Sequence, residues 1–142
     1  MEIEYQLSRT VNAAASECWH LLTDASRAHE WMTVISSAQA QGEPGVGRII
    51  HARGGLLGVT TSALQTVHLW EPERRYGWRG EDPFPLVVEC TLDDADHGTE
   101  FHVEAAADPG RFFRVGKSVV RRAVHTQLNR SGDRFQRLIE AG

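Results

Sequence analysis

Histidine is the most versatile chemical group in this chain of 142 residues, and seven are present, at positions 20, 29, 51, 68, 97, 102 and 125. None of them forms HExxH or another tight spacing that holds a metal ion, so no metal site is predicted. We expect His51 to point inward and contact a ligand, because its strand follows the turn at 45–47 into the sheet. The alternation there is ambiguous, since Ile49 and Ile50 are adjacent. The alternative is a core or rim histidine that bonds to backbone.

Serine and cysteine offer no recognisable nucleophile. No serine lies in the GxSxG pattern of a nucleophile elbow. Cys18 and Cys90 are far apart and form neither a CxxC pair nor a disulfide framework. Cys90 is expected on the dry face of its strand, where burial raises the pKa of a thiol, so we assign it to a ligand-binding wall rather than to catalysis. The glycines of 45–47 lack the strand–helix unit of a nucleotide site, and no cofactor is predicted.

Aromatic and amide side chains are the better candidates for binding. Five aromatic residues are expected to line an internal cavity, where they suit flat or apolar ligands: Trp31, Tyr76, Trp78, Phe101 and Phe112. The alternative is that they simply fill the core. Gln127 falls on the inner stripe of the predicted final helix, and Gln65 points inward if Val67 and Leu69 do. A buried amide needs a partner, which is either a ligand or the neighbouring backbone.

Two turn-rich segments carry apolar residues that would lie at the mouth of such a cavity. They are RGGLLG (53–58), with Leu56 and Leu57, and EDPFP (81–85), with Phe84. Apolar side chains at loop tips indicate a gate or a contact surface. The alternative is that they fold back onto the core.

The elements that would position these residues follow from hydrophobic periodicity. Ile3, Tyr5 and Leu7 alternate with polar residues and predict a first strand. The segment 11–32 predicts two short helices that are broken near 23–26. Six further strands are predicted near 35–41, 47–53, 59–70, 75–80, 86–92 and 99–107, joined by hairpin-length turns. A final helix is predicted from an Asp108–Pro109 cap to Glu140, about 45 Å long, with Gly132 expected to bend or interrupt it.

Together these elements predict an α+β fold within residues 1–142, taken as one domain. A seven-stranded antiparallel, curved sheet would wrap around the long C-terminal helix, with the two short helices after the first strand. The alternation on the last two strands places Cys90 and Phe101 on the dry face and His102 on the wet face. A curved sheet around a helix often leaves a cavity between them.

Composition and charge exclude several classes of protein. Hydrophobic residues make up 41% of the chain, too many for a disordered protein. No apolar stretch approaches the roughly 18 residues of a membrane span. The N-terminus, MEIEYQLSRT, lacks the basic start and apolar run of a secretory signal, so we expect a cytoplasmic protein. The formal net charge of −4 argues against general nucleic-acid binding.

The net charge conceals a basic C-terminal segment. Residues 111–140 hold eight basic and two acidic residues. Arg111, Arg114, Arg121 and Arg122 are expected opposite the apolar stripe of the helix. They would form either a docking face for an acidic partner or an ordinary solvated helix face.

The order and punctuation of these segments resemble the START-like (SRPBCC) superfamily with the helix-grip fold, in its polyketide cyclase/dehydrase-like group. The segments that carry the resemblance are VNAAASECWHLLTDASRAHEWM (11–32), GEPGVGRI (42–49), VHLWEPERRYGWR (67–79), LDDADHGTEFHVE (92–104) and the final helix. In this order they are specific for the fold but not for the ligand.

The resemblance implies a small apolar, aromatic or polyketide-like ligand held between sheet and helix. A second hypothesis is a polyketide aromatase/cyclase-type enzyme, for which no catalytic residue is identified. A third hypothesis is an interaction protein. It would bind an acidic partner through the basic C-terminal helix, or bind a second copy of itself as a homodimer.

Overall fold

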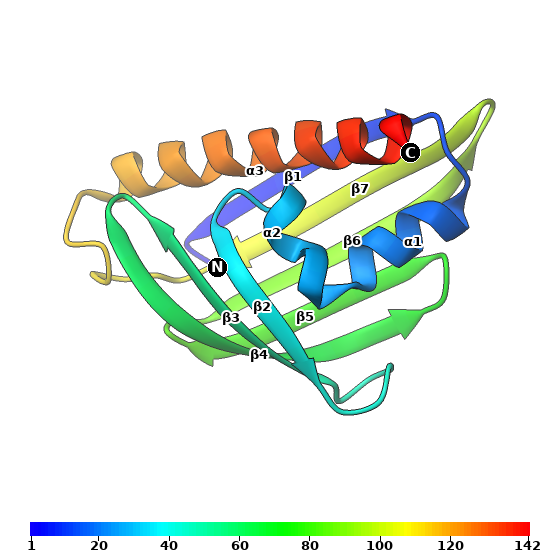
Figure 1. Cartoon of the computed structure of the whole chain (residues 1–142). Coiled ribbons are helices and arrows are strands. Elements are labelled where there is room, and N and C mark those ends of the chain that lie inside the picture. Colours follow the sequence, from blue (N-terminus) through cyan, green and yellow to red (C-terminus); the bar gives the residue numbers. More distant parts are fainter.

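Seven antiparallel strands form one curved sheet in the order β1-β7-β6-β5-β4-β3-β2, which leaves β1 and β2 at the edges (Figure 1). The structure is a computed structural model that describes residues 1–142. The strands are β1 (Ile3–Val11), β2 (Ile35–Gln41), β3 (Ile49–Leu56), β4 (Val59–Glu71), β5 (Arg75–Asp82), β6 (Leu86–Ala95) and β7 (Gly98–Ala107). The predicted sheet and the predicted helix-grip arrangement are confirmed.

The four helical elements lie on the concave face of the sheet. The short helices α1 (Ala15–Thr23) and α2 (Ala28–Trp31), with the 3₁₀ turn η1 (Ala25–Arg27) between them, follow β1. The long helix α3 (Lys117–Ala141) crosses above β1 and β7 (Figure 1). No helix is long and apolar enough to cross a membrane.

Alternation along the strands sends apolar side chains to the concave face. On β7, Phe101 and Val103 are buried while Glu104 is exposed. On β6, Cys90 and Leu92 are buried, as predicted. A β-bulge on β4 between Val67 and Leu69 breaks this alternation. The consequence is that Trp70, rather than Leu69, packs inward against Trp19 and Tyr76.

The predicted start of the final helix is wrong. The helix begins at Lys117, after an irregular segment, and Asp108 does not cap it. Instead, the Asp108 carboxylate accepts a hydrogen bond from the backbone N–H of Glu2, which ties this segment to β1. The helix has 25 residues and is about 37 Å long. Phe112 and Phe113 therefore belong to the connecting segment and not to the helix.

The interpretation of Gly132 as a bend or break is also wrong, because α3 continues through it. Gly132 is buried where the helix meets β1. A Cβ atom at this position would lie 3.1 Å from Leu7 Cδ1, so glycine permits the close approach of helix and strand.

The predicted loop 53–58 is shorter than expected. Strand β3 continues to Leu56, and a two-residue turn of Leu57 and Gly58 leads into β4. Both turn residues have positive φ angles, 53° and 78°, as a tight hairpin turn requires. Leucine is unusual at such a position because its Cβ disfavours positive φ.

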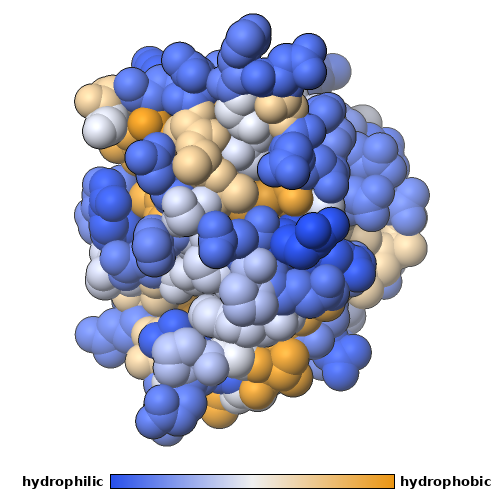
Figure 2. Space-filling model, turned by 90° about the vertical axis from the view of Figure 1, so that its right-hand side faces the viewer, coloured by the Kyte–Doolittle hydropathy of each residue, from blue (hydrophilic) through white to orange (hydrophobic).

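The two ends of the space between sheet and helices differ in their side chains. The end near α1 and the C-terminus is filled by large rings, among them Trp19, Trp31, Tyr76 and Phe101. Figure 2 views the molecule from this end, where the surface is mainly hydrophilic with small apolar patches. The opposite end, near the β3–β4 hairpin and the start of α3, contains the cavity described next.

Candidate functional site

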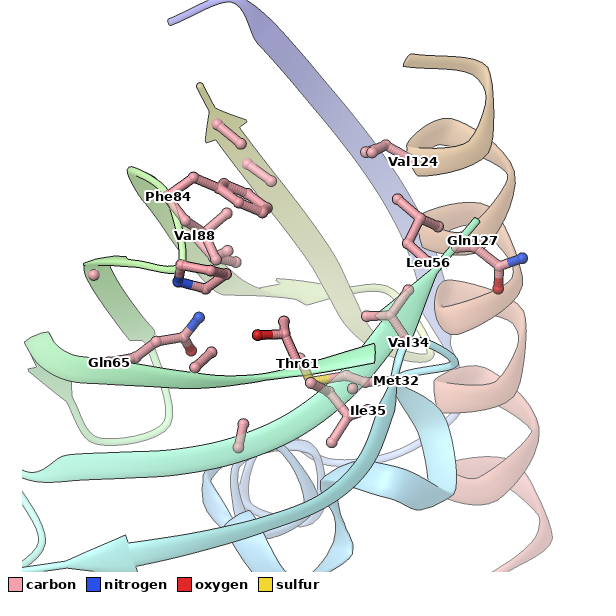
Figure 3. A pocket seen from close by; sticks show the side chains of 18 of the residues that line it. Met32, Val34, Ile35, Leu56, Thr61, Gln65, Phe84, Val88, Val124 and Gln127 are labelled. Carbon is pink, nitrogen blue, oxygen red and sulfur yellow. The ribbon is translucent and has the colours of Figure 1, made fainter. Parts of the chain in front are cut away.

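A cavity of about 220 Å³ lies between the concave face of the sheet and the N-terminal half of α3. Twenty of its 28 lining residues are hydrophobic. Figure 3 shows side chains from β2, β3, β4, β6 and α3 converging on it. The site is therefore built by the curvature of the sheet, and each strand contributes only the residues of its inward face.

Small residues in the walls create this empty space. Gly54 on β3, Ala63 on β4, Gly80 on β5 and Ala105 on β7 all line the cavity. At the other end of the same strands, the inward positions hold Tyr76 and Phe101, which are buried in the core. The sheet thus changes from large to small side chains along its length, and the cavity occupies the part with small ones.

Few polar groups reach the lining. Thr61 and Gln65 lie four residues apart on β4, and both line the cavity. The Gln65 side-chain amide points into the cavity and makes no hydrogen bond with the rest of the protein (Figure 3). Asp82 contributes the one carboxyl group of the lining and is exposed at the end of β5. The hydroxyl of Tyr5 is engaged, because it donates a hydrogen bond to Asn129 Oδ1 of α3.

Three phenylalanines gather at the opening of the cavity. Phe84, from the turn between β5 and β6, lies 5.4 Å from Phe112 and 5.8 Å from Phe113 between ring centroids. Phe112 and Phe113 are 5.0 Å apart and nearly perpendicular. These rings, together with Leu56 and Val59 of the β3–β4 hairpin, line the end of the cavity that we call the mouth. Ring pairs of this kind attract one another by about 0.5–1.5 kcal/mol beyond their burial.

Six of the predicted site residues come together in this cavity. The following predicted site residues all line it: Gln65, Trp78, Phe112, Gln127, Leu56 and Phe84. Gln127 sits on the inner side of α3 but its amide turns away from the other labelled side chains (Figure 3). Its backbone oxygen accepts hydrogen bonds from Thr33 and Ser131, so this residue also serves the helix.

Four predicted site residues are core residues outside the cavity lining. Trp31 packs edge-on against Phe135, at 5.1 Å between ring centroids. Phe101 stacks on the same ring. Tyr76 lies among Trp19, Trp70 and Trp78, and burial raises its pKa to about 12. Cys90 is fully buried, and this burial raises the pKa of its thiol. These side chains belong to the hydrophobic core.

Two other predictions of orientation are corrected. His51 points to the outer face of the sheet, where it is exposed and its Nε2 lies 2.9 Å from Gln41 Oε1. Its neighbours Ile50 and Ala52 hold the inward positions and are buried. Leu57 does not line the cavity and projects outward from the hairpin with 41% of its surface exposed.

Several other apolar residues that line the cavity were not named as site residues in the sequence analysis. The structure adds several apolar ones: Ile3, Met32, Val34, Ile35, Val59, Leu86, Val88 and Val124. Met32 and Val34 lie in the short link between α2 and β2, where no periodicity marks an inward face. Small residues could have indicated the cavity from the sequence. Gly54–Gly55 and Ala105–Ala107 all lie in strands and line it, and their small side chains leave space next to the sheet.

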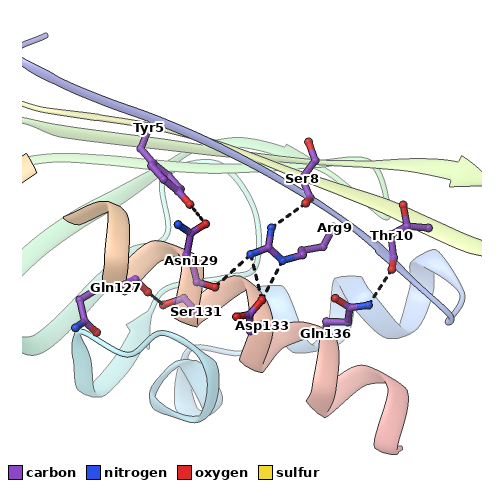
Figure 4. Close-up of polar contacts among 9 residues, drawn as sticks. All are labelled: Tyr5, Ser8, Arg9, Thr10, Gln127, Asn129, Ser131, Asp133 and Gln136. Atoms are coloured by element: carbon purple, nitrogen blue, oxygen red, sulfur yellow. Dashed lines mark hydrogen bonds and ion pairs between the residues drawn. The ribbon is translucent and has the colours of Figure 1, made fainter. Parts of the chain in front are cut away.

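Polar contacts hold α3 over β1 and leave its other side free to cover the cavity (Figure 4). Arg9 of β1 donates to the Asp133 carboxylate at 3.1 Å, and Gln136 Nε2 donates to the Thr10 carbonyl at 3.1 Å. On the α2 side, the Thr33 backbone N–H donates to Ser131 Oγ at 3.0 Å. These contacts lie in the middle and C-terminal part of α3, whereas Val124 and Gln127 in its N-terminal half line the cavity.

Several titratable side chains lie on the outer face of the sheet. His102 is half-buried there, as predicted for the wet face, with Ser8 Oγ 2.6 Å from its Nδ1. Glu100 Oε1 lies 3.3 Å from its Nε2. No group of three or more His, Cys, Asp or Glu side chains is arranged to hold a metal ion.

A curved antiparallel sheet that grips a long C-terminal helix around an apolar cavity defines a START-like, helix-grip protein. The chain belongs to the family described as "Polyketide cyclase / dehydrase and lipid transport", whose model matches residues 2–140. The superfamily assigned from the sequence motifs is thereby confirmed. No curated protein matches the chain at a significant level.

Solved structures share this fold at low sequence identity. A protein from Nitrosomonas europaea superimposes with a TM-score of 0.76 at 16% identity, over 99% of this chain and 96% of that one. The di-domain ARO/CYC StfQ from the steffimycin biosynthetic pathway gives 0.78 at 10% identity, over 98% of this chain and 51% of that one. The di-domain ARO/CYC BexL from the BE-7585A pathway gives 0.75 at 14%, over 100% and 52%. The chain thus spans about half of each di-domain protein.

Proposed function

We propose that the protein binds a small, flat, apolar ligand in the cavity between the sheet and α3. The observation that carries this proposal is the apolar lining, in which 20 of 28 residues are hydrophobic. Burial of apolar ligand surface against such a wall is favourable by about 25 cal/mol per Å². The rings of Trp78 and Phe112 add faces for offset stacking with an aromatic ligand.

The size of the cavity limits the ligand. An engineered apolar cavity of about 150 Å³ accommodates benzene, and pockets for drug-sized ligands range over roughly 300–1,000 Å³. A cavity of about 220 Å³ therefore suits a compound of one or two rings. A longer molecule would have to protrude between the phenylalanines of the mouth.

The polar groups of the lining suit orientation of a ligand better than proton transfer. Gln65 and Thr61 offer amide and hydroxyl groups, which bind a carbonyl or hydroxyl of the ligand without changing their own charge. The lining contains no histidine, cysteine, lysine or arginine. We therefore propose a ligand that is apolar along most of its length, with one oxygen function near Gln65.

The family supports this choice of ligand in general terms. Its description names polyketide cyclase, dehydrase and lipid transport, and lipids are largely apolar molecules. Two structural neighbours are ARO/CYC proteins of biosynthetic pathways. At 10–14% identity this likeness concerns the fold and does not by itself extend a cyclase activity to this chain.

Native mass spectrometry of freshly purified protein, followed by extraction and analysis of any bound compound, tests the proposal. We expect either a copurifying apolar compound or saturable binding of 2-naphthol by titration calorimetry. The matched pair of variants is Ala63→Phe, which fills the cavity from β4, and Leu64→Phe, which places the same ring on the outer face of the same strand. Binding should be lost in Ala63→Phe and retained in Leu64→Phe. Equal binding in both would refute the cavity as the site.

A further inference from the structure

Exposed apolar side chains are concentrated around the mouth of the cavity. Six large hydrophobic residues of the chain are strongly exposed, and four of them surround this end: Met1, Leu57, Val115 and Val119. Leu57 forms the tip of the β3–β4 hairpin, and Val115 and Val119 flank the start of α3. Contacts between Glu2 and Asp108 and between Glu2 and Lys117 hold the N-terminus beside them.

The same end of the molecule carries a local positive charge. Residues 108–122 include five basic residues and one acidic residue, in a chain whose net charge is −4. Arg111, Arg114, Arg121 and Arg122 are exposed, and none of them takes part in an ion pair. Lys117 is paired with Glu2 at 2.6 Å. Glu81 and Asp82 are exposed at the end of β5, whereas the basic residues lie in α3 and the segment that precedes it.

Leu57 gives a separate argument that this surface contacts something outside the chain. Its φ angle of 53° is a conformation in which hairpin turns favour asparagine or glycine. A leucine there is strained, and its side chain gains little from the protein because 41% of it is exposed. The hairpin tip and the first turn of α3 lie at the same end of the molecule (Figure 1).

We propose that this surface, made of Met1, Leu57, Val115, Val119 and the four unpaired arginines, docks the mouth onto an anionic lipid bilayer. Protruding aliphatic side chains enter the boundary between headgroups and acyl chains, while arginines bind phosphate groups. An acidic protein offers the charge complement, but it would need pockets for side chains that project from a hairpin tip and a helix start. A bilayer accepts such protrusions without a preformed pocket.

Docking in this orientation would join the mouth to the hydrocarbon of the membrane. The phenylalanines of the mouth and the exposed aliphatic residues would then form a continuous apolar path. An apolar ligand could pass between bilayer and cavity without crossing water, which removes the hydration cost of the transfer. This proposal rests on the ligand-binding function proposed above, to which it adds the membrane as source or destination.

Sedimentation with phosphatidylcholine vesicles, with and without phosphatidylglycerol, tests the docking. We expect binding only to the anionic vesicles and a decrease in binding as salt is added. The double variant Arg111→Glu/Arg114→Glu should bind at least about 30-fold more weakly, because each basic residue near an anionic membrane contributes about 1 kcal/mol. The matched control is Arg134→Glu/Arg137→Glu, which makes the same change in charge at exposed sites near the other end of α3.

Leu57→Asn tests the apolar part of the surface, since asparagine suits the turn conformation. We expect it to weaken vesicle binding without lowering the free energy of unfolding. Wild-type protein that fails to sediment with anionic vesicles would overturn the proposal. Retention on poly-glutamate without vesicle binding would overturn it in favour of an acidic protein partner. Equal losses of vesicle binding in the two arginine double variants would show that binding depends only on net charge, and this result would also overturn the proposal.

The cavity-filling variant Ala63→Phe separates this proposal from the proposed function. It should still bind anionic vesicles while it fails to bind 2-naphthol. Vesicle binding without any ligand binding in the wild type would refute the cavity function alone. Ligand binding without vesicle binding would refute the docking alone.

Discussion

Phe101 of β7 and Phe135 of α3 stack with their ring centroids 4.3 Å apart and their planes within 18° of parallel. Neither ring is exposed to solvent. Trp31 of α2 closes the pair edge-on, at 6.5 Å from Phe101 and 5.1 Å from Phe135. This contact joins the sheet, the short helix and the long helix at one point of the core, outside the cavity lining.

Phe135→Ala should therefore lower the free energy of unfolding by about 3–5 kcal/mol, the range for truncation of a buried aromatic ring. Urea denaturation followed by circular dichroism measures the change. Phe112→Ala is the comparison, because its half-buried ring borders the mouth and contributes less to the core. We expect the loss for Phe112→Ala to be less than half as large, and equal losses would contradict the assignment of Phe135 to the core junction.

Gly132→Val should destabilise the protein by about 1–3 kcal/mol, because a branched side chain in the contact between α3 and Leu7 overpacks it. The intrinsic helix propensity acts in the opposite direction, since glycine is the weaker helix former. Thr126→Val, at an exposed position of the same helix, is the control and should change stability little. The double variant with Leu7→Ala should recover part of the loss, and strict additivity of the two changes would argue against the contact.

Most of the fold could be predicted because alternation in strands is a direct consequence of which face is buried. The strands near 86–92 and 99–107 illustrate this, with Cys90 and Phe101 inward and His102 outward. The start of α3 could not be predicted, because Asp108–Pro109 has the residues of a helix cap but its carboxylate binds the backbone of Glu2. That partner lies 106 residues away in sequence, beyond any local pattern.

The candidate site was predicted in part for a similar reason. Gln65 and Trp78 both line the cavity, although the expectation for Gln65 assumed that Leu69 also faces inward, which the β-bulge on β4 prevents. The orientation of His51 was not predicted, because the adjacent Ile49 and Ile50 give no alternation. In the structure Ile50 is buried and His51 is exposed. Whether an inward position belongs to the core or to the cavity depends on where along the sheet it lies, at the end with large rings or at the end with small side chains. That place is set by pairing with distant strands, which no local pattern encodes.

The two cysteines predict a loss of stability at alkaline pH. Burial raises the pKa of Cys18 to about 11 and raises that of Cys90 as well. In the unfolded chain both thiols ionise near their usual pKa of 9.0. Above that pH the unfolded chain loses these two protons while the folded protein keeps them, so a rising pH favours the unfolded state. Stability is fully present below about pH 9 and falls as the pH rises through about 11. Urea midpoints across this range measure it.

The same burial predicts that neither thiol reacts with a thiol reagent such as DTNB in the folded protein at about pH 8, where free thiols react readily. Both should react after unfolding in urea. The variant Cys90→Ala should show a shallower decline of stability with pH than the wild type. An unchanged pH dependence in this variant, or a fast reaction of the native protein, would contradict the assigned burial.

Gln65→Leu should change the preference of the cavity between ligands. Loss of the amide removes a hydrogen bond with a net value of about 0.5–1.5 kcal/mol, so 2-naphthol should bind about two- to twelvefold more weakly. Naphthalene, which has no hydroxyl group, should bind equally well or better. Gln39→Leu, at an exposed position of β2, should alter neither affinity. A parallel loss for both ligands would show that Gln65 acts only on the shape of the wall.

Phe113→Ala should open the mouth without altering the cavity behind it. The ring of Phe113 contacts Phe84 and Phe112 at centroid distances of 5.8 Å and 5.0 Å. If these contacts stabilise the closed mouth by about 1.4 kcal/mol, their loss raises the population of the open mouth about tenfold. Association and dissociation rates of 2-naphthol would then both rise about tenfold while the Kd stays nearly constant, because the bound and free states are otherwise the same. Stopped-flow fluorescence measures both rates, with Val115→Ala as the control, since Val115 is exposed and makes no ring contact. A change in Kd through the dissociation rate alone would instead place Phe113 among the residues that hold the bound ligand.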